Sequence, residues 1–436
     1  MATDMLLAVN CGSSSIKFKL YSLSDLDTLI SGSASNVEVK GARPSIKYIV
    51  HESGQDEYEK VSEEEKEGMA YEDVFERMIS LIEGSSSKHF VAKEKSESKP
   101  RARDLVKVVA HRVVHGGTES EPMAIWPGHE DGLEKMDALS AFAPLHNHFA
   151  VQVVRFCLEH IPNSRQILLF DTMFHSTLPP HIYTYPLAPS SRKPPIPLRK
   201  YGAHGLSYAS ILDNVSSHLG KSKHECSLII AHLGSGASVC LIKDGKSYDT
   251  SMGLTPLDGT FHRLPGGTRT GSVDPVLIFH HTPNASEPTH IPGGQCAKAE
   301  IVLNKQGGLQ ALAGTSNFGE ISSSNEDKAR LTYDLFLDRL MNYIGAYVVK
   351  AQGKLDGIVF SGGIGEKSVK LRDDVGRAFG WLGCVVDQGA NEAVGSQKHT
   401  VTEITDKTSR LKLFVCLTDE ESQCARMAKN FCESRF

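Results

Sequence analysis

Residues 6–21 of the chain read LLAVNCGSSSIKFKLY, and residues 228–245 repeat the pattern as LIIAHLGSGASVCLIKDG. Each stretch has an apolar run, a turn of small residues and a second apolar run, which is typical of a β-hairpin. Backbone N–H groups and Ser hydroxyls in such a turn can approach an anion closely. This weak internal repeat predicts a duplicated domain with one phosphate-binding hairpin in each half.

Further apolar runs alternate with helical patterns, which predicts α/β layers with buried strands. We expect strands at residues 106–110, 166–170, 357–360 and 412–417, and helices at residues 326–352 and 420–431. Within 326–352 an apolar stripe recurs at spacings of four or five residues: Leu331, Leu335, Leu340, Ile344 and Val348. Residues 57–67, 84–103 and 280–295 are predicted to be solvated surface insertions.

The composition excludes several classes of protein. The 436 residues carry 47 Lys and Arg against 52 Asp and Glu, and 40% are hydrophobic, so we expect a soluble chain of about two or three domains. There is no basic patch for nucleic acid, and no apolar run long enough for a membrane span. Nine cysteines without a C-x-x-C pair predict reduced, buried thiols and a cytoplasmic location.

Polar residues follow several of the predicted strands, where open α/β sheets bind ligands. They are Asn10, His111 with Arg112, Asp171, His232 and the run TDEE at residues 418–421. Arg112 and Arg269 lie beside glycines and are suited to grip phosphate or carboxylate, although a surface salt bridge is the alternative for each. Asp171 and Glu420 could hold Mg²⁺ directly or through water, or cap a helix. P-loop, G-x-S-x-G and H-E-x-x-H motifs are absent.

Ten ordered blocks carry a resemblance to a known family. They are NCGSSSIK at 10–17, HRVVHGG at 111–117, APLHN at 143–147, FDTMFH at 170–175, YGAHG at 201–205, HLGSGAS at 232–238, SMGLTPLDG at 251–259, GTRTGSVDP at 267–275, FSGGIGE at 360–366 and TDEE at 418–421. The chain resembles the acetate kinase, or acetokinase, family of the actin-like and sugar-kinase-like superfamily. The resemblance implies duplicated ribonuclease-H-like α/β domains with an active-site cleft between two lobes.

The resemblance also implies two domains and a set of site residues. We expect an N-terminal lobe at 1–172 completed by 421–436, and a nucleotide-binding lobe at 173–420. The prolines of residues 178–198 are expected to forbid a regular helix or a central strand, which predicts a crossover between the lobes there. The catalytic residues implied are Arg112, Asp171, His204, Arg269 and His146, and the metal ligands Asn10 and Glu420. The substrate wall implied is Arg112, Val114, Leu145, Ala203 and Pro256. The phosphate and nucleotide residues implied are Ser13, Ser15, Lys17, His232, Gly234, Ser235, Gly236, Asn317, Phe318, Gly362, Gly363, Ile364 and Gly365.

The activity implied is reversible phosphoryl transfer between ATP and acetate, giving ADP and acetyl phosphate, with Mg²⁺ or Mn²⁺ and in a homodimer. Because acetate is already ionised at neutral pH, it needs no general base. We therefore interpret His204 as a hydrogen-bond donor to the transition state. In this hypothesis of direct in-line transfer, Arg112 orients the carboxylate, and Arg269 with His204 brackets the moving phosphoryl group.

Several residues depart from the family pattern and keep alternatives open. Ala203 stands where the family has an aromatic residue, which favours propionate or another short acyl chain as an alternative substrate. Asn317, Gly319 and Lys367 change the adenosine segment, so pyrophosphate is an alternative donor. Ser235 replaces an Asn, and residues 260–266 form an insertion next to Arg269. A remote alternative is an inactive nucleotide-binding or filament-forming relative.

Overall fold

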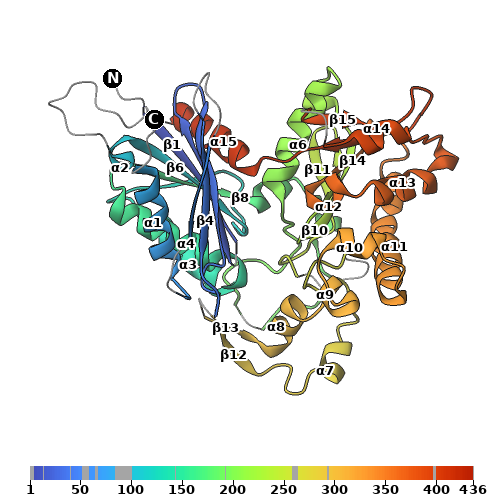
Figure 1. Cartoon of the computed structure of the whole chain (residues 1–436). Coiled ribbons are helices and arrows are strands. Elements are labelled where there is room, and N and C mark those ends of the chain that lie inside the picture. The colour runs from blue at the N-terminus through green and yellow to red at the C-terminus, as the bar shows by residue number, and fades with distance from the viewer. Residues whose placement is uncertain are drawn as a thin grey trace. The chain divides into compact units, whose positions relative to one another are not determined.

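The computed structural model (Figure 1) describes residues 4–12, 14–39, 41–51, 58–63, 67–83, 101–142, 144–191, 193–257, 264–291, 294–395 and 399–435. For residues 58–63, 102, 141, 142 and 144–146 it describes the backbone alone. Contacts between residues divide the chain into two compact units. Unit 1 comprises residues 1–173, 292–294 and 420–436, and unit 2 comprises residues 174–291 and 295–419.

Unit 1 is built on an eight-stranded sheet with the order β5-β4-β3-β2-β1-β6-β8-β7. The strands are β1 (Met5–Cys11), β2 (Ser15–Ser22), β3 (Thr28–Ser35), β4 (Ser45–Val50), β5 (Tyr58–Glu63), β6 (Val106–Val113), β7 (Met123–Ile125) and β8 (Arg165–Phe170). β1 to β5 pair as an antiparallel meander, whereas β1, β6 and β8 run parallel. The parallel strands therefore end at the same edge of the sheet.

Helices cover both faces of this sheet (Figure 1). They are α1 (Tyr71–Glu83), α2 (Ala102–Leu105), α3 (Asp131–Phe142), α4 (Pro144–His160) and, from the chain's other end, α15 (Glu420–Arg435), while a 3₁₀ turn at Asp171–His175 follows β8. On one face Leu7 and Val9 join the core formed with Phe75 of α1 and Val153 of α4. On the other, α15 packs on β1 and β6 through small buried residues such as Cys424 and Ala425.

Unit 2 repeats part of this plan in a six-stranded sheet with the order β11-β10-β9-β14-β16-β15. The strands are β9 (Leu228–Leu233), β10 (Ala237–Lys243), β11 (Lys246–Thr250), β14 (Gly357–Ser361), β15 (Val401–Glu403) and β16 (Leu413–Cys416). β9 pairs antiparallel with β10 and parallel with β14. β12 (Pro288–Ile291) and β13 (Gly294–Ala297) form a separate two-stranded sheet.

Alternate residues of the strands in unit 2 face different helices. Besides α6 (Gly205–His218) and α11 (Asp327–Lys350), which cover this sheet, the described helices of unit 2 are α5 (Pro180–Tyr183), α7 (Leu277–His281), α8 (Lys298–Lys305), α9 (Gly308–Ala313), α10 (Phe318–Ser323), α12 (Gly362–Lys367), α13 (Val369–Ala378) and α14 (Gln388–Ala393). Ile229 and Leu241 pack in the cluster that contains Phe336 of α11 (Asp327–Lys350). Ile230 and Cys240 pack in the cluster that contains Tyr208 of α6 (Gly205–His218), as expected for a sheet with both faces covered.

The two predicted hairpins are confirmed, as are the strands and helices expected from the other apolar runs. β1 pairs with β2 from Met5↔Ser22 to Cys11↔Ile16, and β9 pairs with β10 up to Leu233↔Ala237. The predicted α/β fold class is therefore confirmed. All nine cysteines are free, and seven are buried. No helix among the described residues is long and apolar enough to cross a membrane.

Three predictions made from local pattern were wrong in part. Residues 58–63, inside the predicted acidic loop, form the edge strand β5, because an edge strand exposes one side to water and tolerates charged residues. Residues 280–295 contain β12, which pairs with β13, while 84–100 lie outside the described residues. The prolines of 178–198 permit a short helix, α5, since Pro180 lies at its start, where no N–H is needed.

The predicted apolar stripe on α11 was wrong at one position. Leu331 is 62% exposed, whereas Tyr333, Phe336 and Leu340 are buried. Spacings of four and five residues drift around a helix that turns once every 3.6 residues. Leu331 lies nine residues before Leu340, two and a half turns away, and so faces the opposite side.

Candidate active site

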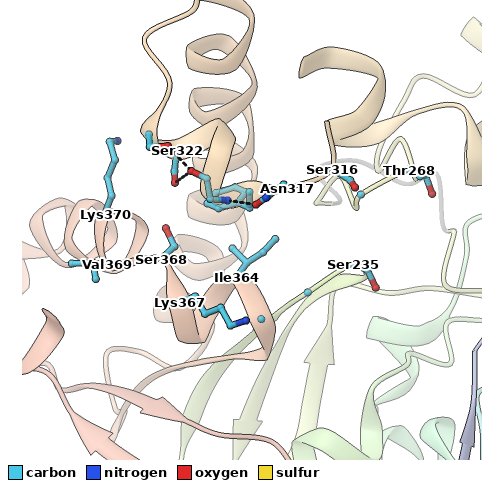
Figure 2. A pocket seen from close by; sticks show the side chains of 16 residues that line it. Ser235, Thr268, Ser316, Asn317, Ser322, Ile364, Lys367, Ser368, Val369 and Lys370 are labelled. Atoms are coloured by element: carbon cyan, nitrogen blue, oxygen red, sulfur yellow. Dashed lines mark hydrogen bonds between the residues drawn. The ribbon is translucent and has the colours of Figure 1, made fainter. Parts of the chain in front are cut away.

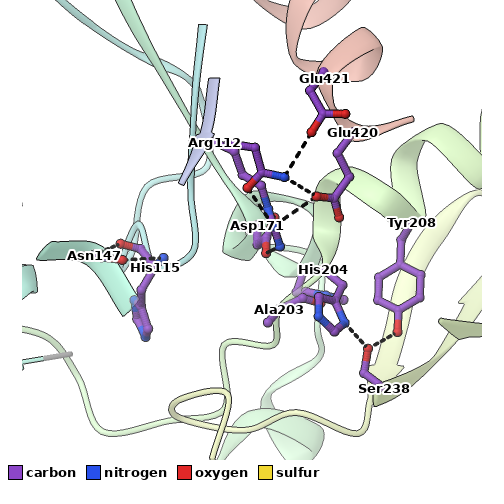
Figure 3. Close-up of polar contacts among 12 residues, drawn as sticks. Arg112, His115, Asn147, Asp171, Ala203, His204, Tyr208, Ser238, Glu420 and Glu421 are labelled. Atoms are coloured by element: carbon purple, nitrogen blue, oxygen red, sulfur yellow. Dashed lines mark hydrogen bonds and ion pairs between the residues drawn. The ribbon is translucent and has the colours of Figure 1, made fainter. Parts of the chain in front are cut away.

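Three parallel strand ends in unit 1 bring polar side chains together, as predicted. Asn10 of β1 lies beside Arg112 of β6 in the sheet register, and Asp171 follows the last residue of β8. Arg112 donates to both carboxylate oxygens of Asp171, from Nε at 3.2 Å and from Nη2 at 2.8 Å. Its Nη1 lies 3.1 Å from Oδ1 of Asn10 and 3.0 Å from Oε2 of Glu420 (Figure 3).

This network fixes the charge of Arg112. Its side chain is 15% exposed and that of Asp171 is fully buried. Burial alone would lower the pKa of Arg112, but the charges of Asp171 and then Glu420 more than offset this effect and raise that pKa above its usual value. The bidentate contact with Asp171 also holds the guanidinium in one plane. Unit 1 therefore presents a permanent, oriented cation at the ends of its parallel strands.

Glu420 reaches the network because it begins α15. Asn10 Nδ2 donates to Oε2 of Glu420 at 2.8 Å and to Oε1 of Glu421 at 3.3 Å. The helix start is held to β2 by a hydrogen bond of 2.9 Å between Tyr21 and Ser422. Acidic residues in the first helical turn are favoured by the helix dipole. Asn10, Asp171 and Glu420 thus supply several oxygen atoms to one small region, which suits a hard cation.

Two hydrogen bonds of Gly12 hold the turn of the first hairpin in unit 1. Gly12 N–H donates to the Ser15 carbonyl at 2.8 Å, and the Tyr71 hydroxyl donates to the Gly12 carbonyl. Ser15 is half-buried and Lys17 is exposed. Ser13, the third residue predicted in this turn, lies outside the described residues. The structure therefore shows an ordered frame around this predicted phosphate loop.

A pair of hydrogen bonds in unit 1 positions the segment after β6. The Asn147 side chain accepts from His115 N–H at 3.0 Å and donates to the His115 carbonyl at 2.7 Å (Figure 3). This double contact holds the half-buried Val114, which lies next to His115 and two residues after Arg112 in the chain. The side chains of Leu145 and His146, which were predicted as a substrate-wall residue and a catalytic residue, lie outside the described part of the structure.

In unit 2 His204 lies against the second hairpin. A Cβ added at Gly236 would lie 3.3 Å from Nε2 of His204 and 3.4 Å from Nη1 of Arg269. The two rings of His204 and His232 have centroids 4.7 Å apart. His204 and Arg269, which were predicted to be catalytic, therefore meet at Gly236, where the missing side chain leaves room for an anion.

The backbone around this turn is held by neighbouring loops. Gly234 N–H donates to the Gly236 carbonyl at 3.0 Å, and Gly267 N–H donates to the Ser235 carbonyl at 3.0 Å. Gly267 lies two residues before Arg269, so this bond ties the arginine's loop to the hairpin. Ser235 itself is exposed, and most of the 260–266 insertion lies outside the described residues.

A cavity of about 670 Å³ opens beside the second hairpin (Figure 2). Its lining comes from that hairpin, the loop before Arg269, α10 and the region of α12 and α13: Gly234, Ser235, Gly267, Thr268, Ser316, Asn317, Phe318, Gly319, Ser322, Ser323, Gly363, Ile364, Lys367, Ser368, Val369 and Lys370. This volume lies within the range of about 300 to 1,000 Å³ that is usual for small-molecule sites. The predicted phosphate turn and adenosine segment therefore border one pocket.

Asn317 helps to shape one wall of this pocket. Its Oδ1 accepts from Gly319 N–H at 3.0 Å and caps α10, and its Nδ2 donates to Glu320 at 2.8 Å. The departure from the family pattern therefore has a structural use here, since an Asn cap stabilises a helix start. Phe318 is buried behind it.

The opposite wall begins at the end of β14. Gly362 has a φ of 74°, and a Cβ there would lie 2.7 Å from the Leu233 carbonyl oxygen, so a side chain is excluded by both strain and contact. The buried Arg372 holds the far end of α12 by donating to the carbonyls of Gly365 and Glu366 at 2.9 and 2.8 Å. It also donates to Asn391, which in turn donates to the Val369 carbonyl.

The predicted acyl wall of unit 2 is buried. Ala203 is 2% exposed, and Pro256 is also buried. The Ala203 carbonyl accepts from Nε2 of His175 at 3.0 Å, while Nδ1 of that ring contacts the Ser247 hydroxyl at 2.7 Å. Burial lowers the pKa of His175 to about 4, so the ring is neutral at physiological pH.

Several residues that the structure places at these sites were not predicted from the sequence. Tyr208 and Ser238 lie behind His204, Arg372 supports the pocket wall, and Lys370 lines the pocket. The spacing of His204 and Tyr208, four residues apart at the start of a helix, was a signal that could have revealed one of them. Arg372 carried no such signal, because its partners are carbonyl groups.

Comparison with known proteins agrees with the resemblance seen in the ten sequence blocks. A family model described as the Acetokinase family matches residues 5–426. The chain belongs to the acetokinase family. It is 46% identical over 441 residues to a "Probable acetate kinase" of Cryptococcus neoformans var. neoformans serotype D (strain B-3501A), with 98% of each chain covered.

Solved structures of a propionate kinase and an acetate kinase share the fold. A propionate kinase from Francisella tularensis subsp. tularensis SCHU S4 is 31% identical with a TM-score of 0.78, covering 98% of this chain and 99% of that one. An acetate kinase from Porphyromonas gingivalis is 28% identical with the same TM-score of 0.78, covering 98% and 100%. The predicted family is confirmed over nearly the whole chain.

Proposed function

We propose that the chain is an acetate kinase, which transfers the γ-phosphoryl group of ATP reversibly to acetate and yields acetyl phosphate and ADP. The observation that carries this proposal is its likeness, at 46% identity over the full length, to a protein named as an acetate kinase. The two clusters of charged and glycine residues described above supply the chemistry that such a transfer needs.

We assign the acyl end of the reaction to unit 1. Arg112 keeps its positive charge at any physiological pH and is held in one orientation by Asp171. A guanidinium in fixed orientation is suited to align the carboxylate of acetate and to offset the charge that repels the incoming phosphoryl group. Val114 supports this proposal as a neighbouring apolar side chain for the acetate methyl group.

We assign the phosphoryl and nucleotide end to unit 2. The small residues of the hairpin 234–236 would let the terminal phosphates approach the backbone closely, and Arg269 and His204 lie beside the same turn. Both side chains can donate to the equatorial oxygens, on which negative charge is spread in the transition state. The adenosine moiety is assigned to the cavity between Asn317 and Ile364.

Mg²⁺ fits the oxygen-rich end of unit 1. Among the described residues no three acidic, His or Cys side chains are arranged to hold a metal alone. Mg²⁺ commonly uses one or two carboxylates together with water and substrate phosphates, so Glu420 and Asp171, with Asn10, are an adequate set. When bound, Mg²⁺ or Mn²⁺ supplies charge neutralisation to the phosphate oxygens.

We also propose that residues 1–172 with 421–436, and residues 173–420, act as the two lobes of the enzyme, since residues assigned to the reaction come from both. We expect the enzyme to work in the cytoplasm, where ATP is supplied, and as a homodimer. Light scattering of the purified chain at micromolar concentration tests the oligomeric state, because a dimer has twice the mass of 47.5 kDa.

Propionate is the second candidate substrate. The small Ala203 and the likeness to a solved propionate kinase both favour it. Pyrophosphate is the less favoured donor, because the 670 Å³ cavity beside the hairpin offers more space than a second phosphate group requires. These alternatives change the substrate and leave the assigned roles of Arg112 and Arg269 unchanged.

One panel of assays tests the proposal. Purified protein with Mg²⁺ is supplied with ATP or pyrophosphate, and with acetate, propionate or butyrate, and the acyl phosphate is trapped with hydroxylamine. We expect the highest kcat/KM with ATP and acetate. If kcat/KM were highest with propionate, propionate would replace acetate as the proposed substrate, and if it were highest with pyrophosphate, pyrophosphate would replace ATP as the proposed donor. Folded protein without activity on any pair would overturn the proposal.

A further inference from the structure

Two hydroxyl groups form a chain behind His204 in unit 2. The Ser238 hydroxyl lies 2.8 Å from Nδ1 of His204, and the same oxygen is hydrogen-bonded to the Tyr208 hydroxyl (Figure 3). Tyr208 is on α6 and Ser238 is on β10, and both are fully buried. The half-buried imidazole is therefore the outer end of a chain that runs into the core.

The backbone fixes the place of this imidazole. His204 precedes α6 in the left-handed conformation, with a φ of 58°, which is costly for a residue with a Cβ. Gly202 also has a positive φ of 83°, and the carbonyl of Ala203 between them accepts from His175. The strained peptide is thus anchored by a buried side chain, and the ring has little freedom to turn away.

The two nitrogens of the ring face different surroundings. Nδ1 faces Ser238, whereas Nε2 is directed to Gly236 and lies on the side of Arg269. The ring of His232 on β9 also packs against it, with the ring centroids 4.7 Å apart. A neutral imidazole carries one N–H, and which nitrogen carries it decides whether His204 can donate toward the phosphate hairpin.

The acidity of the two hydroxyl groups favours one direction of hydrogen-bond donation, from Tyr208 to Ser238 and from Ser238 to His204. A phenol is a stronger hydrogen-bond donor than an aliphatic hydroxyl, since its pKa is about 10. With the Tyr208 O–H donating to the Ser238 oxygen, the Ser238 O–H is directed to Nδ1 of His204. Nδ1 then accepts, and the proton of the neutral ring resides on Nε2.

We propose that Tyr208 and Ser238 are positioning residues that hold His204 in the tautomer with its proton on Nε2, so that this N–H faces the hairpin 234–236. The proposal deepens the proposed function and rests on it for the role of the donor. No proton is released: the Nε2–H of His204 remains a hydrogen-bond donor to the phosphoryl oxygens through the reaction.

The tautomer is measured directly and without any assay of activity. Protein labelled with ¹⁵N-histidine gives distinct nitrogen shifts for the two neutral tautomers and for the cation, and the signals of His204 are assigned by their loss in His204→Gln. We expect the wild-type ring at pH 7.5 to carry its proton on Nε2. A ring that carries it on Nδ1 overturns the proposal even if the enzyme is an active acetate kinase.

Two variants test the chain, and one variant serves as a control. Tyr208→Phe and Ser238→Ala each remove one hydroxyl, and we expect kcat to fall about fivefold and about tenfold or more, as for lost or unsatisfied buried hydrogen bonds. The KM values of ATP and acetate should change less than about twofold, because the contact acts in the transition state. Tyr347→Phe removes another buried hydroxyl of unit 2, far in sequence from His204, and should keep wild-type kcat.

The nitrogen spectra of the same variants complete the test. We expect Ser238→Ala to lose the preference for the Nε2 proton and Tyr208→Phe to weaken it, with circular dichroism and thermal unfolding close to those of Tyr347→Phe. Wild-type tautomer and wild-type kcat in both variants would overturn the proposal. Absence of acyl phosphate formation by wild-type protein would instead overturn the proposed function, because the tautomer is read independently.

Discussion

The hairpins β1–β2 and β9–β10 occupy equivalent places in their two sheets. The strand order β3-β2-β1-β6-β8 in unit 1 corresponds to β11-β10-β9-β14-β16 in unit 2, with the same parallel and antiparallel pairs. Asn10 pairs in register with Arg112, and at the equivalent place His232 pairs with Ser361. One topology has therefore received different side chains at the same strand ends.

The different side chains at equivalent strand ends give the two units different binding properties. Where unit 1 has the long cation Arg112, unit 2 has Ser361, whose hydroxyl donates to the Cys416 carbonyl, followed by Gly362 with its positive φ. The turns differ as well, with four residues between Cys11 and Ile16 but three between Leu233 and Ala237. Unit 1 thus concentrates charge, and unit 2 leaves space for a bulky ligand. The topology of the sheet therefore sets where the polar side chains lie, and the residues at the strand ends set which ligands could bind there.

The largest expected effect comes from removing the cation of unit 1. Arg112→Ala should lower kcat about 10³-fold, because an electrostatic donor is lost at the point of transfer. It should also lower the free energy of unfolding by about 3 to 5 kcal/mol, since Asp171 and Glu420 lose their buried partner. Hydroxamate formation and denaturant unfolding measure the two effects.

Arg269→Ala is the matched variant in unit 2. It should lower kcat by about 10² to 10³ as well, but it should change the unfolding free energy by less than about 1 kcal/mol, because this side chain is half-exposed. Equal losses of stability in the two variants would contradict the contrast drawn between the units. Folded Arg112→Ala with kcat within tenfold of wild type would contradict the role of Arg112.

Alanine substitutions in the turns of the two hairpins should lower kcat to different extents. Gly236→Ala should lower kcat about thirtyfold, since the new methyl group would displace His204 and Arg269, and small displacements of reacting groups cost this much. Gly12→Ala should lower it less than about fivefold, because the added Cβ meets the Ser15 hydroxyl at 3.0 Å, and that side chain can rotate away. Steady-state kinetics of both variants test this order, which a larger loss in Gly12→Ala would reverse.

Loss of the Arg372 hydrogen bonds that support one wall of the unit 2 pocket should weaken nucleotide binding selectively. Arg372→Met removes the hydrogen bonds that hold the end of α12, so KM for ATP should rise about tenfold, the equivalent of one or two hydrogen bonds, while KM for acetate stays within about twofold. Arg377→Met is the control, because Arg377 is an exposed residue of α13, the helix that also carries Arg372. A parallel rise in both KM values would show that Arg372 supports the fold in general.

The smallest effect concerns one buried histidine in each unit. Burial lowers the pKa of His111 and of His175 to about 4. The usual value in an unfolded chain is about 6.5, so between these pH values the unfolded chain binds more protons. The stabilisation is complete above about pH 6.5 and is lost as the pH falls toward 4. From pH 7 to 5.5 each histidine should account for a loss of about 1 kcal/mol in unfolding free energy.

Substitution identifies this contribution. His111→Gln should reduce the pH-dependent loss by about 1 kcal/mol, whatever its effect on stability at pH 7. His290→Gln, which replaces an exposed histidine, is the control. Denaturant unfolding at pH 7 and pH 5.5 measures both effects. An unchanged pH dependence in His111→Gln would mean that folding does not lower the pKa of His111.

The sequence predicted most of the fold and only part of the candidate site. The strands at 6–10 and 228–231 were predictable because apolar runs next to Gly and Ser turns have few alternatives. The strand β5 was not, since its pairing with β4 rather than its own composition forms it. Leu331 was misplaced because a spacing rule ignores the drift of the helical repeat.

The same distinction holds for the site. Asn10 and Arg112 lie at the ends of β1 and β6, Asp171 follows β8, and all three were found from local sequence. Their mutual contacts follow from the parallel register. Ser238 and Arg372 act through partners that only the fold brings near, His204 and the carbonyls of α12. Local pattern could not reveal contacts made by tertiary packing.

Titration of ADP into the protein tests the central claim, that the unit 2 pocket holds the nucleotide. A Cβ added at Gly363 meets nothing within 4 Å, so Gly363→Leu should place its side chain in the pocket without disturbing the wall. By calorimetry we predict that ADP binds wild type and that its affinity for folded Gly363→Leu falls at least about 100-fold, as for a blocked site. Wild-type affinity in Gly363→Leu would contradict the assignment of this pocket.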